Sequence, residues 1–329
     1  MLKKRLQWRL WMVFLIAAVI LGGLYYYGVF ARQKKNPAAY SVILYQNTLD
    51  EWTTLVEGAA QAEEDLELDV NYVYFSSDDT AQEQAAVIRR EINAGASGIL
   101  LAAVDSEGVR EALGTTVFSI PVVCVETGAG EEFPVIRADD RAMGRALGRA
   151  ILKDMDRSGG KRRVMVLKEY MQRDSVRLRY EGLMEVLKAA EERIVIEECT
   201  RQDKKSDIGR LVGKKLQDEP PYLVALDKYV TEQAAEVWEA ERQKYEKKGF
   251  VCKIYGIGNT AKTVNDLDNE NIEALIYQNE FNMGYQGITY LAEERKKSWI
   301  DKNVNIRYGV VTRESLYEDE NQRLLFPNT

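Results

Sequence analysis

Unbroken apolar runs alternate with helix-periodic segments along most of the chain, and this alternation constrains the fold more than any other feature. Apolar runs such as "YSVILYQ", "PVVCV" and "EALIYQ" are each followed by a segment with helical periodicity. Buried strands joined by helices are typical of a parallel sheet covered on both faces. About ten such units are too many for one small doubly wound sheet, so the sequence predicts an α/β fold of two Rossmann-like lobes. Helices are expected, among others, over residues 205–217, 229–247 and 280–297.

Charge and histidine content exclude several classes of function. Residues 1–35 hold seven basic residues and no acid, so the rest of the chain sets 52 acidic residues against 38 basic ones. A body this acidic is a poor nucleic-acid binder, because affinity for phosphates comes from basic patches. The chain has no histidine, which excludes Ser-His-Asp and Cys-His catalysis and His-containing zinc sites. No Gly-rich phosphate loop is present, and we expect no cofactor and no metal.

The three cysteines are widely spaced, so we expect no disulfide framework, with a single disulfide pair as the alternative. Cys124 and Cys252 lie in apolar runs, where we expect buried, inert thiols. Cys199 ends the run "IVIEEC", and an exposed thiol is one interpretation of its position.

The N-terminal segment is predicted to cross a membrane. A basic leader, residues 1–9, precedes 21 uncharged residues, 10–30, and their length matches a bilayer-spanning helix. The leader favours a cytoplasmic N-terminus, which places the body outside the cytoplasm, in the cell envelope. Cleavage of a signal peptide near Ala31 is the alternative, although the apolar core is longer than usual for one. Residues 31–38 are interpreted as a linker to the body, residues 39–329.

Candidate ligand contacts follow from the rule that such folds bind ligands beyond the carboxyl ends of their strands. Amide, carboxylate, arginine and aromatic side chains follow the predicted strands, and these are the groups that hold a polyol. We expect ligand contacts from Asn47, Asp50, Trp52, Glu126, Arg177, Asp227, Asn259 and Gln278.

Each candidate also has a purely structural interpretation. Asp50 is suited to capping the helix that it opens, and Trp52 to a place in the core. Glu126 and Asp227 would be ordinary solvated loop carboxylates, Asn259 a turn residue, and Gln278 part of a strand-to-helix junction.

The segment "RDSVRLRYEGL", at the start of a predicted helix, contains three arginines, of which Arg177 is the candidate ligand contact. Arg177 can pair with Glu181 one turn later on its own helix, or it can point toward a ligand. For Arg173 and Arg179 we expect a solvated position.

Four segments, "GILLAAVDSEGVREAL", "SIPVVCVE", "VIRADDRAMGRALGRAIL" and "RDSVRLRYEGL", resemble the type I periplasmic sugar-binding proteins, the ribose- and galactose-binding group. They also resemble the effector domains of lactose-repressor-type regulators. The likeness covers about residues 40–312. Because a repressor has an N-terminal helix-turn-helix and this chain has an apolar segment there, the resemblance favours the extracytoplasmic branch.

The resemblance implies two lobes joined by three crossovers, near residues 138–139, 278–279 and 303–308. One lobe would comprise about residues 39–138 and 279–303, and the other 139–278 and 304–329. Glu126 matches the family's acidic sugar ligand, and Arg177 matches the first arginine of its "R-x-R-x-x-G" helix start. The remaining family contacts fall on Trp52, Asp227 and Gln278.

Some positions depart from the pattern of ribose binders. Thr127 stands where they carry an arginine, and Ile257 and Gly258 stand where they carry a Phe-Asp pair. These differences leave another monosaccharide, a cyclitol or a different small polar ligand open.

The sequence therefore predicts a non-enzymatic, membrane-anchored solute-binding protein that closes on a small sugar-like ligand for an ABC importer. The alternative is an anchored sugar sensor that signals to a histidine kinase or another membrane partner. A hydrolase with two carboxylates and a ligand-free interaction domain are the remaining alternatives.

Overall fold

The computed structural model describes residues 39–76, 79–114, 120–155, 162–201, 207–219, 221–294 and 306–325. The chain divides into a unit of residues 1–38 and a unit of residues 39–329. The predicted membrane segment, 10–30, its leader and its linker all lie outside the described residues. Within the described part of the chain, no helix combines the length and the apolar character that crossing a bilayer requires.

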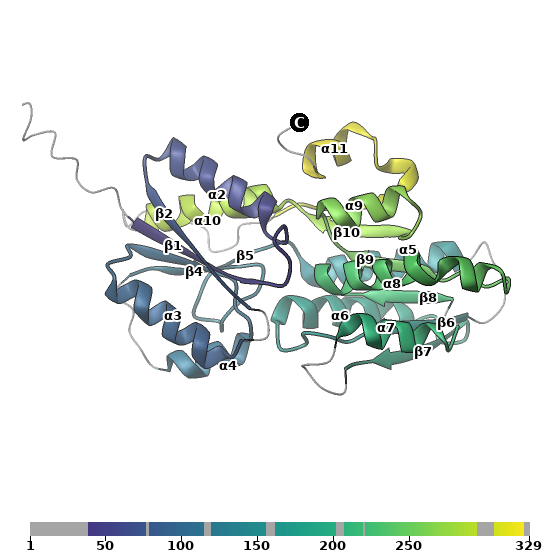
Figure 1. Ribbon diagram of the computed structural model, residues 1–329. Coiled ribbons are helices and arrows are strands. Elements are labelled where there is room, and N and C mark those ends of the chain that lie inside the picture. Colours follow the sequence, from purple (N-terminus) through teal and green to yellow (C-terminus); the bar gives the residue numbers. More distant parts are fainter. Residues whose placement is uncertain are drawn as a thin grey trace, which may run out of the picture. The chain divides into compact units, whose positions relative to one another are not determined.

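The first lobe, called lobe one, is built on a five-stranded parallel sheet in the order β2-β1-β3-β4-β5 (Figure 1). In the ribbon view α2 and α10 lie on one face of this sheet and α3 and α4 on the other (Figure 1). Its strands are β1 (Ala39–Gln46), β2 (Asp69–Ser76), β3 (Gly98–Leu101), β4 (Val122–Val125) and β5 (Val135–Ile136). Its helices are α2 (Thr53–Asp65), α3 (Ala81–Asn93), α4 (Ser106–Leu113) and α10 (Glu280–Glu294).

The second lobe, lobe two, is built on a six-stranded sheet in the order β11-β10-β9-β8-β6-β7. Helices α5 and α6 pack against each other, as do α7 and α8 and, further along, α8 and α9. Its strands are β6 (Arg162–Leu167), β7 (Ile194–Cys199), β8 (Tyr222–Ala225), β9 (Lys253–Ile257), β10 (Ala274–Gln278) and β11 (Tyr308–Thr312). Its helices are α5 (Asp140–Met155), α6 (Asp174–Lys188), α7 (Ile208–Leu216), α8 (Lys228–Glu246), α9 (Ala261–Asp268), the 3-10 turn η1 (Arg313–Ser315) and α11 (Asp319–Leu325).

The central strands explain why the apolar runs were unbroken. Every residue of β3, β4, β8 and β10 is buried, as expected for strands covered by helices on both faces. The predicted two-lobed α/β fold with parallel sheets is therefore confirmed.

One strand departs from the predicted parallel arrangement. β11 pairs antiparallel with β10, with Tyr308 opposite Gln278 and Thr312 opposite Ala274. The chain leaves lobe two at the carboxyl end of β10, forms α10 in lobe one, and returns beside the same end of β10. The returning strand therefore runs in the opposite direction.

Two helix pairs cross where glycines allow their backbones to touch. In lobe two, a Cβ atom on Gly144 of α5 would lie 1.9 Å from the carbonyl oxygen of Arg179. In lobe one, a Cβ atom on Gly58 of α2 would lie 1.9 Å from the carbonyl oxygen of Phe281 in α10. Both lobes therefore use small residues to bring one helix close to its partner.

All three cysteines are unpaired and buried. Burial raises the pKa of the Cys124 thiol and of the Cys252 thiol to about 12, as expected for inert thiols. The exposed position considered for Cys199 is wrong, because its residue is only 4% exposed at the end of β7.

Candidate functional site

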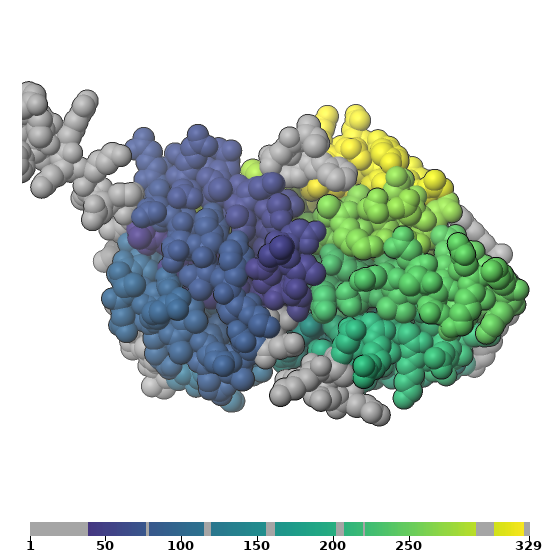
Figure 2. Space-filling view, viewed as in Figure 1, coloured from purple at the N-terminus to yellow at the C-terminus, as the bar shows by residue number. Residues whose placement is uncertain are grey.

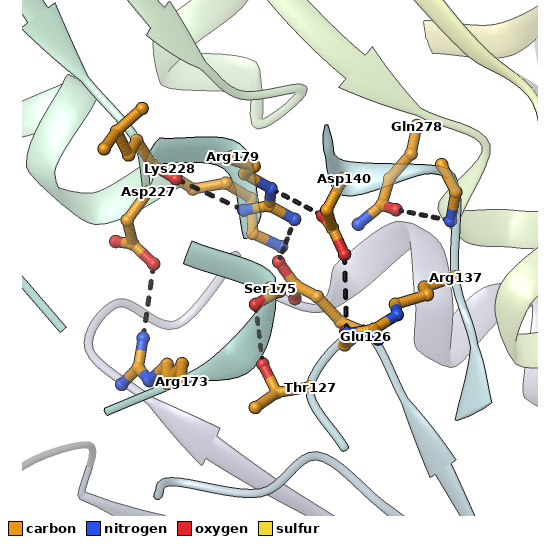
Figure 3. A network of polar contacts seen from close by, with 12 residues as sticks. Glu126, Thr127, Arg137, Asp140, Arg173, Ser175, Arg179, Asp227, Lys228 and Gln278 are labelled. Atoms are coloured by element: carbon orange, nitrogen blue, oxygen red, sulfur yellow. Dashed lines mark hydrogen bonds and ion pairs between the residues drawn. The ribbon is translucent and has the colours of Figure 1, made fainter. Parts of the chain in front are cut away.

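Eight charged side chains are buried where the strand-end loops of the two lobes meet, and most of them appear in Figure 3. We call this set the junction cluster. Most members lie in a loop that follows a strand or at the beginning of a helix, the place where α/β folds bind ligands, and Arg179 lies one turn further along α6. The cluster comprises Arg173, Arg179, Lys228, Glu51, Glu126, Asp140, Asp227 and Glu280.

Arg179 of α6 joins lobe two to the end of β4 in lobe one. Its guanidinium is fully buried and donates from Nη2 to Glu126 Oε1 at 3.0 Å, from Nε to Asp140 Oδ1 at 2.7 Å, and from Nη1 to the Leu226 carbonyl at 3.3 Å. Glu126 has a φ of 59°, a left-handed conformation that is uncommon outside glycine. The fork of Arg179 therefore holds two carboxylates and a carbonyl around a strained strand end.

Arg173 is sandwiched between two tyrosine rings. Its guanidinium carbon lies 3.7 Å from the ring centre of Tyr45 in lobe one and 4.1 Å from that of Tyr170 in lobe two. It donates from Nη1 to Asp227 Oδ2 at 3.2 Å, and the other oxygen of Asp227 caps α8 through the Tyr229 amide. Cation–π contact with both rings helps to offset the desolvation of this buried arginine.

Lys228, the first residue of α8, extends from lobe two into lobe one. Its ammonium donates to the Glu51 carbonyl at 2.7 Å and to Glu280 Oε1 at 2.9 Å, and it lies 4.3 Å from the ring centre of Trp52. In the space-filling view the loop after β1, in dark purple, adjoins the green surface of lobe two (Figure 2).

Further hydrogen bonds connect the lobes beside the junction cluster. The hydroxyls of Thr127 and Ser175 lie 2.8 Å apart (Figure 3). The Gly128 amide donates to Asp174 Oδ1 at 2.9 Å, and the Asp174 amide donates to Ser106 Oγ at 3.0 Å. The structure is therefore a closed conformation in which strand-end loops of both lobes are in contact.

Burial and the excess of carboxylates shift the pKa values within the cluster. Desolvation, reinforced by Asp227, raises the pKa of Glu51 to about 7, and desolvation raises the pKa of Asp140 to about 6. Desolvation also raises the pKa of Glu280. For Glu126 desolvation acts in the same direction, but the charges of Lys228 and Arg179 prevail and lower its pKa.

The raised pKa of Glu51 predicts a pH-dependent effect of Glu51→Gln. The folded state binds the Glu51 proton more tightly than the unfolded state, so this group lowers the stability of the wild type as the pH rises from about 4.5 through about 7. A rise of the Glu51 pKa from 4.5 to about 7 corresponds to about 3 kcal/mol. We expect Glu51→Gln to match the wild type at about pH 4, below the ordinary pKa of a glutamate, and to exceed it by about 1–3 kcal/mol at about pH 8. Urea denaturation at both pH values tests this, and a difference independent of pH would contradict it.

The structure brings five of the eight predicted contacts together and leaves three outside the buried group. Asn47 is half-buried and accepts a hydrogen bond from the Tyr170 hydroxyl at 3.4 Å. Asp50 is exposed, and it does not cap α2, whose N-cap residue is Trp52 without a side-chain cap. The buried members of the predicted set are Trp52, Glu126, Asp227, Asn259 and Gln278.

The buried candidates differ in what they contact. Gln278 accepts a hydrogen bond from the Ala138 amide at 3.3 Å, which links two of the segments that pass between the lobes. Asn259 hydrogen-bonds to Glu280. Trp52 donates from its indole nitrogen to the Tyr45 carbonyl and is buried, as the core interpretation required. Glu126 and Asp227 are not solvated loop carboxylates.

The burial of the three arginines is the reverse of what the sequence led us to expect. The side chain of Arg177 is 51% exposed and pairs with Glu181 at 2.9 Å, which is the arrangement given above as the alternative to a ligand contact. Arg173 and Arg179, expected to be solvated, are fully buried. The helical periodicity of α6 indicates that Arg179 is buried, because Arg179 lies three residues after Val176 and four before Leu183, on the buried face of the helix.

Sequence reasoning also missed Glu51, Asp140, Lys228 and Glu280. Glu51 and Lys228 each directly follow a predicted candidate, Asp50 and Asp227, whereas Asp140 and Glu280 are the first residues of α5 and α10. Among the described residues, no group of cysteine and carboxylate side chains is arranged to hold a metal ion.

Two cavities flank the junction cluster between loops of the two lobes. One, of about 730 Å³, is lined by residues that include Thr80, Tyr170 and Arg201. The other, of about 1440 Å³, is lined by residues that include Arg137 and Arg177. Neither is lined by Arg179, Glu126 or Lys228, so the cluster is sealed from both cavities in this closed conformation.

Residues 40–297 match a family model described as a periplasmic binding protein domain. No curated protein matches the chain in sequence.

Solved structures of the same fold include sugar-bound proteins at low sequence identity. A carbohydrate transporter solute-binding protein from Agrobacterium radiobacter, in complex with D-arabinose, has 16% identity and a TM-score of 0.76, covering 89% of this chain and 100% of its own. A solute-binding protein of an ABC transporter from Agrobacterium vitis with bound D-fucose has 16% identity and a TM-score of 0.76, covering 88% and 100%. A chain of the XylFII-LytSN complex has 17% identity and a TM-score of 0.69, covering 84% and 98%. At these identities the likeness concerns the fold.

Proposed function

Because this chain belongs to the periplasmic binding protein family, we propose that its two-lobed unit is an extracytoplasmic solute-binding domain that closes over a small sugar-like ligand for an ABC importer. In this proposal the junction cluster, with the neighbouring Asn47, Trp52, Asn259 and Gln278, forms the ligand site. Two structural neighbours of the same fold were solved with D-arabinose and D-fucose, which supports a sugar-like ligand.

The observation that carries the proposal is a set of buried polar atoms without hydrogen-bond partners. Nε and Nη2 of Arg173 and Oε2 of Glu126 are buried and have no hydrogen-bond partner among the residues that the structure describes, and leaving such groups unsatisfied is costly. A hydroxyl both donates and accepts, so a polyol can accept from the arginine and donate to the carboxylate. The rings of Tyr45 and Tyr170 beside Arg173 offer the apolar surface that the faces of a sugar ring require.

Ligand entry requires the lobes to separate, because the unpaired atoms are sealed in the closed conformation. A ligand then shifts the equilibrium toward closure only by binding the closed state more tightly than the open one. Groups from both lobes meet at the cluster, which provides this difference in affinity.

The proposal predicts thermal stabilisation by a ligand of this class. We would record the melting temperature of the full chain against pentoses, hexoses, deoxysugars, cyclitols and quorum-signal furanoses. A ligand at about 100 times its dissociation constant should add about 2.7 kcal/mol of stability. A protein that melts cooperatively and is unaffected by the entire panel would contradict the proposal.

Residues 10–30 are proposed as a retained membrane anchor, with residues 1–9 in the cytoplasm and the binding unit on the outer side. N-terminal sequencing of the membrane-extracted protein distinguishes a retained anchor, which begins at Met1, from cleavage near Ala31.

An anchored sensor is the second candidate, and a specific observation favours it. One structural neighbour forms part of a complex with a second protein, XylFII-LytSN. In a sensor, the closed lobes would be recognised by a membrane partner such as a histidine kinase. A permease gene beside this one favours import, and a kinase gene favours sensing. In both cases we propose binding without catalysis.

A further inference from the structure

Lys228 places a cation from lobe two inside lobe one. Its side chain is 4% exposed, and the described hydrogen-bond and ring contacts of its ammonium are made with the Glu51 carbonyl, the Glu280 carboxylate and the Trp52 ring. Glu51 and Trp52 precede α2, and Glu280 begins α10, a helix that packs on α2. Lobe one therefore supplies these contacts.

Within lobe two, the ammonium of Lys228 is in an unfavourable position. It lies at the first residue of α8, where the helix already carries a partial positive charge, and burial of an ammonium is costly unless it is paired. Burial would lower the pKa of Lys228, but Glu280 and the carboxylates of Glu126 and Glu51 raise it, so the side chain stays protonated. The compensation for burying this charge comes from lobe one.

The three groups around the ammonium form a complete site for a primary amine. An ammonium has three N–H donors. Two of them are used by the Glu51 carbonyl and the Glu280 carboxylate, and the face of Trp52 completes the surroundings. We call these three groups the ammonium cup.

The cup is held in shape by contacts other than Lys228. Trp52 is fixed by its hydrogen bond to the Tyr45 carbonyl and by edge-to-face packing on the Tyr45 ring, at 5.1 Å between centres. The Glu51 carboxylate accepts from the Asn47 amide at 2.6 Å, which fixes the turn that presents the Glu51 carbonyl. The cup is therefore preorganised to receive a cation.

We propose that Lys228 is a tethered ligand: it fills a primary-ammonium site of lobe one and holds the two lobes closed in the absence of a free solute. The inference rests on the proposed opening and closing of the lobes. It follows that closure is largely formed before a solute binds, and that the solute occupies the part of the cluster around Arg173 and Glu126.

The test is the distance between the lobes in the absence of any solute. Fluorophores on cysteines introduced at Gln82 in lobe one and Lys214 in lobe two, both exposed positions, report opening by energy transfer in the full chain. The three native cysteines are buried. We expect the parent protein to show high transfer, and Lys228→Met to increase the low-transfer population about tenfold or more.

Lys262→Met is the matched control. Lys262 also forms an ion pair, with Asp266 at 2.9 Å, but both residues belong to α9 in lobe two. Removing it leaves every contact between the lobes intact, so transfer should be unchanged. Glu280→Gln is the second test variant, because it keeps the shape of the cup and removes its charge, and we expect it to open the lobes as Lys228→Met does.

Chemical rescue tests the chemistry of the cup directly. In Lys228→Ala the missing atoms correspond to propylammonium, which should restore high transfer, whereas 1-propanol, which has no charge, should not. The inference is overturned if the parent protein is already open without solute, or if cooperatively melting Lys228→Met remains closed. Neither outcome depends on identifying the solute, so failure here is distinct from failure of the sugar panel.

Discussion

Arg179→Met is expected to destabilise the two-lobed unit by about 3–5 kcal/mol, because it leaves two carboxylates buried without their cation. Arg179 is fully buried and pairs with Glu126 at 3.0 Å and Asp140 at 2.7 Å. Methionine keeps much of the volume of the side chain, so the loss reports the charge rather than a cavity. The measurement is the free energy of unfolding from urea denaturation.

Arg177→Met is the matched control, two residues away on the same helix. Arg177 is half-exposed and pairs with Glu181 at 2.9 Å. Exposed pairs of this kind contribute little, so we expect a change of at most about 0.5 kcal/mol. Equal losses in the two variants would contradict the buried network described around Arg179.

Gly144→Ala is expected to cost about 3 kcal/mol, because the added methyl group meets backbone that cannot move aside. Its Cβ would lie 1.9 Å from the carbonyl oxygen of Arg179, so α5 and α6 must separate. Gly182→Ala should act similarly, since its Cβ would lie 2.0 Å from the carbonyl oxygen of Arg141. Thermal and urea unfolding both measure the loss.

Gly213→Ala in α7 is the corresponding control. The nearest atom to its Cβ would be Val237 Cγ1 at 3.7 Å, an ordinary contact distance. With space available, alanine should stabilise the helix by about 0.5–1 kcal/mol. A loss at Gly213 as large as that at Gly144 would show that helix packing is not the cause.

Much of the fold was predictable because burial on both faces leaves a simple signal. The runs that became β3, β4, β8 and β10 are uninterrupted apolar segments. Helix α8 lies within one residue of its predicted span, whereas the predicted helices 205–217 and 280–297 extend into residues outside the described part of the chain. The antiparallel β11 was not predicted, because its direction depends on where the chain re-enters lobe two.

The sequence predicted where the candidate ligand site lies better than it predicted which residues form it. Glu126, Asp227 and Gln278 were found because strand ends in an α/β fold meet at one edge of each sheet. Arg179 was missed because a charged residue was assumed to be solvated, although helical periodicity placed it with Val176 and Leu183. Lys228 could not be assigned a partner from sequence, since Glu51 and Glu280 approach it only when the lobes close.

The most direct test of the proposed ligand site is a calorimetric titration of the sugar panel's ligand into the wild type, Arg173→Met and Arg177→Met. Two buried donors of Arg173 have no partner in the described part of the chain, whereas Arg177 is half-exposed and pairs with Glu181 on its own helix. A lost hydrogen bond from a charged group costs about 1.5–3 kcal/mol. We therefore predict a loss of affinity of about 10- to 100-fold for Arg173→Met and of no more than about twofold for Arg177→Met. Full affinity in a folded Arg173→Met protein, with a loss in Arg177→Met, would contradict the assignment of the junction cluster as the ligand site.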